Sequence, residues 1–124
     1  MTAHSIEPYD FRAIETRWRD TWRKGGYFHV DTKARENTFY YLNMFPYPSG
    51  YLHVGHGRNY IIGDVLTRFY RMRGYHILNP MGWDAFGLPA ENAAIDRGIH
   101  PREWTVKNIA HAKEQFRAWG IEYD

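Results

Sequence analysis

A proline- and glycine-rich loop that runs directly into an amphipathic helix constrains the fold of this chain more than any other feature. It covers residues 44–59 and reads MFPYPSGYLHVGHGRN. Because Pro46 and Pro48 cannot donate to a sheet ladder, a preceding strand must end before them. The start of the following helix offers backbone N–H groups without helical partners and a partial positive charge. His53 and His56 share one face of that helix, so the segment is typical of a site that binds nucleotide phosphates.

The segments on either side of this loop predict a strand, helix, strand unit. Residues 38–44 are aromatic and β-prone, and residues 76–79 form a second short run that ends at Pro80. Residues 54–73 between them predict a helix that Gly74 closes. Its apolar side chains follow a helical stripe, which comprises Ile62, Val65, Leu66, Phe69 and Met72. Two strands joined by such a helix are expected to be parallel, with a right-handed crossover.

Three further helices are predicted, and together with this unit they define the fold class. The first starts after Asp10, which can cap it, and ends at Gly25-Gly26. The other two cover about 89–97 and 101–119, each with proline in its first turn and glycine after it. We therefore expect an α/β fold. It would be the first half of a Rossmann-like doubly wound parallel sheet, with an amino-terminal helix and two helices after the second strand.

Composition narrows the class of protein without naming a function. A chain of 124 residues has room for one domain, and its 44% of hydrophobic residues is too high for a disordered segment. The absence of cysteine excludes disulfides and thiolate zinc sites. The chain starts without a signal-peptide pattern and has no stretch near the ~18 apolar residues of a membrane span, so we expect a cytosolic protein. A net charge of +2 neither requires nor excludes a nucleic-acid partner.

The two histidines admit more than one interpretation. A metal site is one, but His53-x-x-His56 supplies only two ligands and has no third carboxylate or thiol nearby in the sequence. A second is structural, in which each imidazole hydrogen-bonds its own loop. In the third, both donate hydrogen bonds to charge that develops on a phosphoryl oxygen. The glycines at positions 55 and 57 favour the third, because they would let a ribose or base approach the backbone.

A second unusual loop follows the second predicted strand. In doubly wound folds ligands bind beyond the carboxyl ends of the strands, which here means residues 45–53 and 80–88. Asp84 lies in the second loop, where it could hold an ammonium group or merely cap a turn or helix. Glu91 and Asn92 follow on the next helix and could simply support the loop.

Two segments of the chain carry a family resemblance. MFPYPSGYLHVGH and GWDAFGLPAENAA resemble the two opening signatures of bacterial-type leucyl-tRNA synthetases, which are class I aminoacyl-tRNA synthetases. The tetrad from His53 to His56 resembles the His-x-Gly-His element of the whole class, whereas the leucine assignment rests on the residues around it. The resemblance extends from about residue 9 to the last residue.

This resemblance implies the roles of particular residues. His53 and His56 would be the catalytic residues. ATP would bind against Tyr47, Gly50, His53, Gly55 and His56. Leucine would bind through Met44, Phe45, Tyr47 and Asp84, with its ammonium group held by the Asp84 carboxylate and the Phe45 carbonyl. No metal site on the protein is expected, and Mg²⁺ would arrive with ATP.

The resemblance also implies a reaction and a domain organisation. Leucine would be activated by Mg-ATP to leucyl-adenylate and then transferred to tRNA(Leu). Residues 1–124 would be the amino-terminal portion of the catalytic domain, because a Lys-Met-Ser-Lys-Ser signature, an editing domain and an anticodon-binding domain do not occur in them. Two alternatives remain: a fragment that binds ATP or adenylate without turnover, and a structural piece with no ligand. In each case uncovered apolar surface predicts poor stability or self-association.

Overall fold

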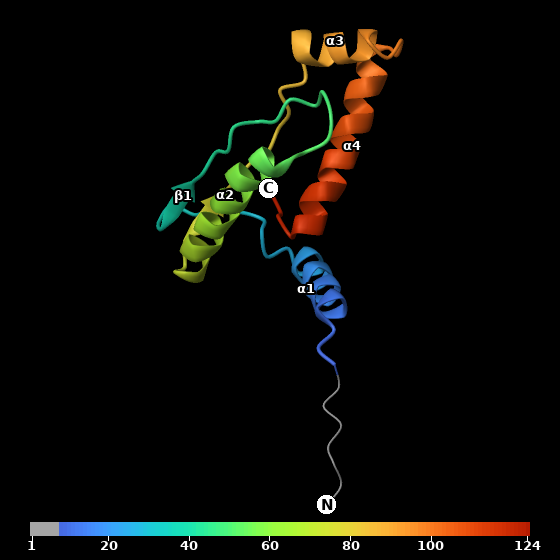
Figure 1. The fold of residues 1–124 in the computed structure, drawn as a ribbon. Coiled ribbons are helices and arrows are strands. Elements are labelled where there is room, and N and C mark those ends of the chain that lie inside the picture. Colours follow the sequence, from blue (N-terminus) through green and yellow to red (C-terminus); the bar gives the residue numbers. More distant parts are fainter. Residues whose placement is uncertain (1–7) are drawn as a thin grey trace, which may run out of the picture.

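A parallel pair of strands with a helical crossover organises the molecule. The computed structural model describes residues 8–124, so the first part of the segment examined for a signal peptide lies outside it. The elements in order are α1 (Phe11–Gly25), β1 (Thr38–Tyr40), α2 (Val54–Met72), β2 (His76–Leu78), α3 (Leu88–Ile95) and α4 (Pro101–Trp119). Phe39 is paired with Ile77 in a parallel ladder, and α2 lies beside the strands, while α4 runs along the other side of α2 (Figure 1). The predicted partial doubly wound α/β fold is confirmed.

The predicted start and end of α1 are confirmed. The Asp10 carboxylate accepts a hydrogen bond of 3.0 Å from the Ala13 N–H and caps the helix. Gly26 adopts a left-handed conformation with φ of 62° and ends it. The helix predicted at 89–97 is shorter, because α3 ends at Ile95 and residues 96–98 continue as a turn.

The first strand is shorter than the predicted 38–44, because its neighbour offers too few partners. The last ladder bond joins the Tyr41 N–H to the Leu78 carbonyl at 3.0 Å. Beyond it the Asn79 N–H donates to the Asp124 carboxylate at 2.9 Å, and Pro80 has no N–H. Residues 41–47 therefore belong to no strand.

The buried side of α2 does not carry the predicted apolar stripe. Its buried residues are Gly57, Tyr60, Gly63 and Thr67. A Cβ atom on Gly63 would lie 2.6 Å from Asn43 Oδ1, so only glycine allows this close packing. The stripe lies on the outside, where Val65 is 59% and Met72 81% exposed.

The hydrophobic core lies between α2, α4 and the end of the chain. It contains Leu52, Tyr60, Ala112, Phe116 and Ile121. Phe116 lies at its centre, with its ring 5.1 Å from the Tyr60 ring and 5.3 Å from the Tyr123 ring, measured between centroids. The core therefore ties α4 to the helix that follows the proline-rich loop. None of the helices within residues 8–124 is long and apolar enough to cross a membrane.

We expect this chain to self-associate through its uncovered apolar surfaces. The α2 stripe is exposed, and so are Tyr40 and Leu78, which are paired across the sheet, and Leu42 just beyond β1. Purely parallel sheets are normally covered on both faces. Val65→Glu should weaken association about tenfold, because it removes the burial of one aliphatic side chain. Sedimentation velocity over a wide concentration range would measure this, with the exposed Lys113→Glu as control. A concentration-independent monomer would contradict the expectation.

Candidate active site

The two predicted loops meet at the carboxyl ends of β1 and β2. The Asp84 N–H donates to the Pro46 carbonyl at 3.1 Å, which joins one loop to the other. The Phe45 ring lies against Gly82, where a Cβ atom would approach the ring to 2.7 Å. The glycine is therefore needed for the close approach of the two loops. This is the juxtaposition expected beyond the strand ends of a doubly wound fold.

The two histidines form a capping box at the start of α2. The His53 Nδ1 accepts a hydrogen bond from the Gly55 N–H, and the His56 Nδ1 accepts one from the His53 N–H, each at 3.1 Å. An Nδ1 that accepts a hydrogen bond carries no proton, so this network assigns both rings as neutral with the proton on Nε2. The structural interpretation of the imidazoles is therefore correct, and it leaves two Nε2–H groups as donors.

The glycines beside the imidazoles have different roles. A Cβ atom on Gly55 would lie 2.9 Å from the Cε1 atom of His53, so this glycine makes room for the capping ring. Gly57 is buried, and a Cβ atom there would face Trp119 of α4 at 3.7 Å. The prediction that Gly57 opens the site to a ligand is therefore wrong, because this residue faces the helix packing.

One backbone donor at the helix start is left over after capping. Within residues 8–124, the Val54 N–H has no hydrogen-bond acceptor, whereas the His56 N–H is directed at the His53 side chain in the capping box and the Gly57 N–H donates to the His53 carbonyl at 3.0 Å. Together with the helix dipole and the two Nε2–H groups, this donor favours an anion at this position.

The pKa of His56 is lowered, first by burial of the ring and then by the neighbouring His53. The folded chain therefore binds fewer protons than the unfolded chain between this lowered pKa and the ordinary value of 6.5. The free energy of unfolding consequently falls as the pH drops through that window.

We expect His56→Gln to reduce this loss of stability at low pH. Glutamine at this position keeps the acceptor of the capping box but does not titrate. Thermal unfolding of both proteins at pH 7.5 and 5.5 would show a smaller decrease in the melting midpoint for the variant. An equal decrease in both would mean that other histidines cause the pH dependence.

The residues expected to hold leucine lie on exposed parts of the two loops. Met44 is 76%, Tyr47 51% and Phe45 38% exposed, and Asp84 is also exposed. The Tyr60 hydroxyl donates to the Met44 carbonyl at 3.0 Å and anchors this loop to α2. Asp84 does not cap α3, since the capping position is Gly87, and its carboxylate has no hydrogen-bond donor within residues 8–124. The helix-cap interpretation of Asp84 is therefore wrong, which leaves this carboxylate accessible to a cation.

Other predicted residues make fewer contacts. Gly50 lies in the loop with open space beside its α-carbon. Glu91 and Asn92 are exposed on α3. No three His, Asp or Glu side chains within the described part of the chain are arranged to hold a metal ion.

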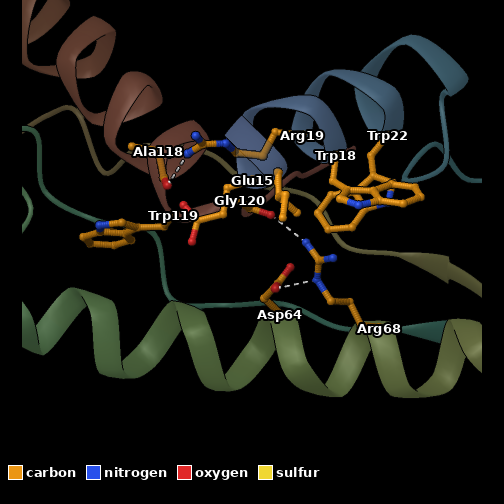
Figure 2. Close-up of a pocket in the computed structure, with 10 residues that line it drawn as sticks. Glu15, Trp18, Arg19, Trp22, Asp64, Arg68, Ala118, Trp119 and Gly120 are labelled. Atoms are coloured by element: carbon orange, nitrogen blue, oxygen red, sulfur yellow. Dashed lines mark hydrogen bonds and ion pairs between the residues drawn. The ribbon is translucent and has the colours of Figure 1, made fainter. Parts of the chain in front are cut away.

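An open pocket beside the amino-terminal helix is separate from these loops. A cavity of about 540 Å³ lies between α1, α2 and α4 (Figure 2). Arg68 crosses it, with hydrogen bonds to the Asp64 carboxylate at 2.7 Å and to the Gly120 carbonyl at 2.6 Å. Arg19 of α1 donates to the Ala118 carbonyl at 2.7 Å. None of the predicted site residues lines this cavity, and its arginines attach α1 and α2 to the end of α4.

Comparisons with known proteins identify the relatives of this chain. A family model described as tRNA synthetases class I (M) matches residues 40–124. Leucine–tRNA ligase of Nitratidesulfovibrio vulgaris (strain DP4) is 56% identical over 116 residues, which cover 94% of this chain and 14% of that protein. The corresponding enzyme of Roseiflexus castenholzii (strain DSM 13941 / HLO8) is 56% identical over 123 residues, or 99% of this chain and 14% of that protein.

Solved structures show the same fold. The crystal structure of the ternary complex of Agrobacterium radiobacter K84 agnB2 LeuRS-tRNA-LeuAMS matches with a TM-score of 0.89 and 46% identity, over 94% of this chain and 15% of that one. Mycobacterium tuberculosis methionyl-tRNA synthetase in complex with methionyl-adenylate matches with a TM-score of 0.69 and 28% identity, over 71% of this chain and 17% of that one. The chain thus spans about 14% of the length of the curated relatives it matches.

Proposed function

Because the chain belongs to the class I tRNA synthetases, we propose that residues 1–124 are the amino-terminal portion of the catalytic domain of a leucine–tRNA ligase. The observation that carries this proposal is the 52–56% identity to leucine–tRNA ligases over nearly the whole chain. The editing and anticodon-binding parts would lie outside these residues. The protein would act in the cytoplasm, in translation.

In this proposal ATP binds at the start of α2. Its phosphates would accept hydrogen bonds from the Val54 N–H and from the Nε2–H groups of His53 and His56. The free donors described above support this role, because they point to an anion without requiring a charged side chain. Tyr47, Gly50 and Gly55 would contact the rest of the nucleotide, and Mg²⁺ would arrive with the phosphates.

Leucine would bind beside the nucleotide, between the two loops. The Asp84 carboxylate and the Phe45 carbonyl would hold its ammonium group, while Met44, Phe45 and Tyr47 surround its side chain. The accessible Asp84 carboxylate and the Asp84–Pro46 backbone hydrogen bond support this arrangement, since they bring an acceptor next to the apolar loop.

The proposed chemistry needs no covalent enzyme intermediate. A carboxylate oxygen of leucine attacks the α-phosphorus of ATP, the bond to pyrophosphate breaks, and leucyl-adenylate forms. A ribose hydroxyl at the tRNA 3′ end then attacks the leucyl carbonyl and AMP leaves. His53 and His56 would act by positioning and by stabilising charge on phosphoryl oxygens.

The second candidate is a chain that binds the adenylate but does not turn over. It is favoured by the 14% of the relatives' length that the chain spans. A chimera tests the two candidates: this chain replaces the matching segment of the 56%-identical Nitratidesulfovibrio vulgaris enzyme. We expect leucine-dependent ATP–pyrophosphate exchange from the chimera, and binding of a leucyl-adenylate analogue without exchange from the isolated chain. A folded chimera without exchange would refute the proposed function.

We expect Asp84→Asn to weaken the binding of leucine but not the binding of ATP. The substitution removes the charge that would hold the ammonium group, while the Asp84 backbone bond to Pro46 remains. In the chimera the KM for leucine should rise roughly tenfold to a hundredfold, as expected for a charged hydrogen bond, with the KM for ATP nearly unchanged. Exchange assays with each substrate varied in turn would measure both. A parallel rise in the two constants would argue against a leucine contact.

A further inference from the structure

One face of α4 holds the loop that precedes α2. Trp104, Asn108, His111 and Gln115 follow each other at spacings of four, three and four, which places them on one side of the helix. We call these four residues the α4 stripe. Trp104, Asn108 and Gln115 each end in a hydrogen-bonding group that contacts the loop. The same face of α4 also carries the buried Ala112.

The contacts of the α4 stripe are directed to the loop backbone. Trp104 Nε1 donates to the Ser49 carbonyl at 3.1 Å, and Asn108 Nδ2 donates to the Pro48 carbonyl at 3.0 Å. The Asn108 side chain is 2% exposed. The His111 ring lies on the Tyr51 ring, with 4.1 Å between their centroids.

Gln115 binds the residue directly before the capping histidine. Its Oε1 accepts from the Leu52 N–H at 3.0 Å, and its Nε2 donates to the Leu52 carbonyl at 3.3 Å. The side-chain amide thus replaces the strand neighbour that this segment lacks. Since Leu52 is buried, loss of Gln115 would leave two backbone groups without partners and free the chain just before His53.

The backbone of this loop has few other hydrogen-bond partners. Residues 41–53 form neither a strand nor a helix, and the carbonyls of Met44 and Pro46 are bound by the Tyr60 hydroxyl and the Asp84 N–H. The carbonyls at positions 48, 49 and 52 accept from side chains of α4, and the His53 carbonyl accepts from the Gly57 N–H within α2. The helix, rather than the sheet, therefore determines where the end of the loop lies.

We propose that the α4 stripe is the positioning device of the phosphate-binding loop, and that Gln115 sets the orientation of the His53–His56 capping box. For the identity of the ligand this inference rests on the proposed function. The residues of the stripe act through the loop backbone, so they are positioning residues and need not touch the nucleotide. No residue of α4 was identified as functional from the sequence.

The test measures the environment of the two imidazoles and the binding of ATP separately, both in the 124-residue chain. Gln115→Ala should change the rate of hydrogen–deuterium exchange at the C2 position of His53 and His56, measured by mass spectrometry. It should also weaken ATP binding about tenfold, the effect of losing about one hydrogen bond from the pre-organised site. Trp104→Phe removes the indole N–H and part of the ring system but leaves the Gln115 contacts in place, and serves as a milder variant with a smaller shift in the same direction.

A stability-matched control separates positioning from general destabilisation. Ile77→Val shortens a buried side chain of β2, at the position paired with Phe39, and should leave both imidazole exchange and ATP binding unchanged. The inference is overturned if Gln115→Ala leaves the imidazole exchange unchanged, or if Ile77→Val alters it equally. If the unsubstituted chain does not bind ATP, the nucleotide site proposed above fails, and the imidazole measurement still decides the role of Gln115.

Discussion

Phe116→Ala is expected to unfold most of the chain. This side chain is 4% exposed, and its ring lies within about 6 Å of four others, which belong to Tyr60, Trp83, Trp119 and Tyr123. Removal of a buried phenylalanine ring costs about 3–5 kcal/mol, from lost apolar burial and from the cavity left behind. A small domain has only about 5–15 kcal/mol of net stability, and this chain leaves much apolar surface uncovered.

Phe86→Ala provides the matched control for this prediction. It makes the same chemical change at a ring that is 91% exposed, so the free energy of unfolding should change by less than about 0.5 kcal/mol. Urea unfolding followed by tryptophan fluorescence would compare the two variants with the unsubstituted chain. Equal midpoints for Phe116→Ala and Phe86→Ala would mean that the packing between α2 and α4 is not the core of the chain.

The sequence predicted those features of the fold that local chemistry decides. Asp10, Gly26 and the prolines of α3 and α4 mark helix ends through capping or backbone conformation, and these depend on neighbours in the chain. The parallel pairing followed from the helix predicted between the two strands, because parallel neighbours need a long crossover connection. The extent of β1 could not be predicted, because it depends on where β2 stops offering partners.

The exposed face of α2 shows why periodicity alone does not locate a core. Its apolar stripe is real, yet Gly63 rather than Val65 is buried, because the side chains of Tyr41 and Asn43 lie too close to it for a larger residue. Periodicity identifies an apolar side of a helix but not the element that covers it. Covering elements are a property of tertiary structure, and an uncovered stripe looks the same in the sequence as a buried one.

The sequence predicted the two loops of the candidate site but not the α4 residues that hold the first loop in place. The two loops meet as expected, because the carboxyl ends of parallel strands lie at one edge. Gln115 was missed because its partner, Leu52, is 63 residues away and is contacted through its backbone, which has no signature in the sequence. The spacing of polar residues at positions 104, 108 and 115 was the only available signal.

The dual use of His53 leads to the prediction with the largest effect on activity. The imidazole caps α2 with its Nδ1, and in the proposed function its Nε2–H donates to a phosphoryl oxygen. His53→Ser separates these two roles, because serine is a favoured capping residue but carries no donor at the position of Nε2. In the chimera we expect leucine-dependent ATP–pyrophosphate exchange to fall about 10²–10³-fold, the typical loss for one donor to a developing oxyanion, while the melting midpoint stays nearly unchanged.

His53→Ala completes the comparison, because it removes both the cap and the donor. It should lose activity to a similar extent and additionally about 1 kcal/mol of stability, the usual cost of deleting a capping side chain. The two variants therefore share one defect and differ in the other, which makes the interpretation independent of folding. Full exchange activity in His53→Ser would show that the imidazole is only a helix cap, and the catalytic role would then rest on His56 and on the Val54 N–H of α2.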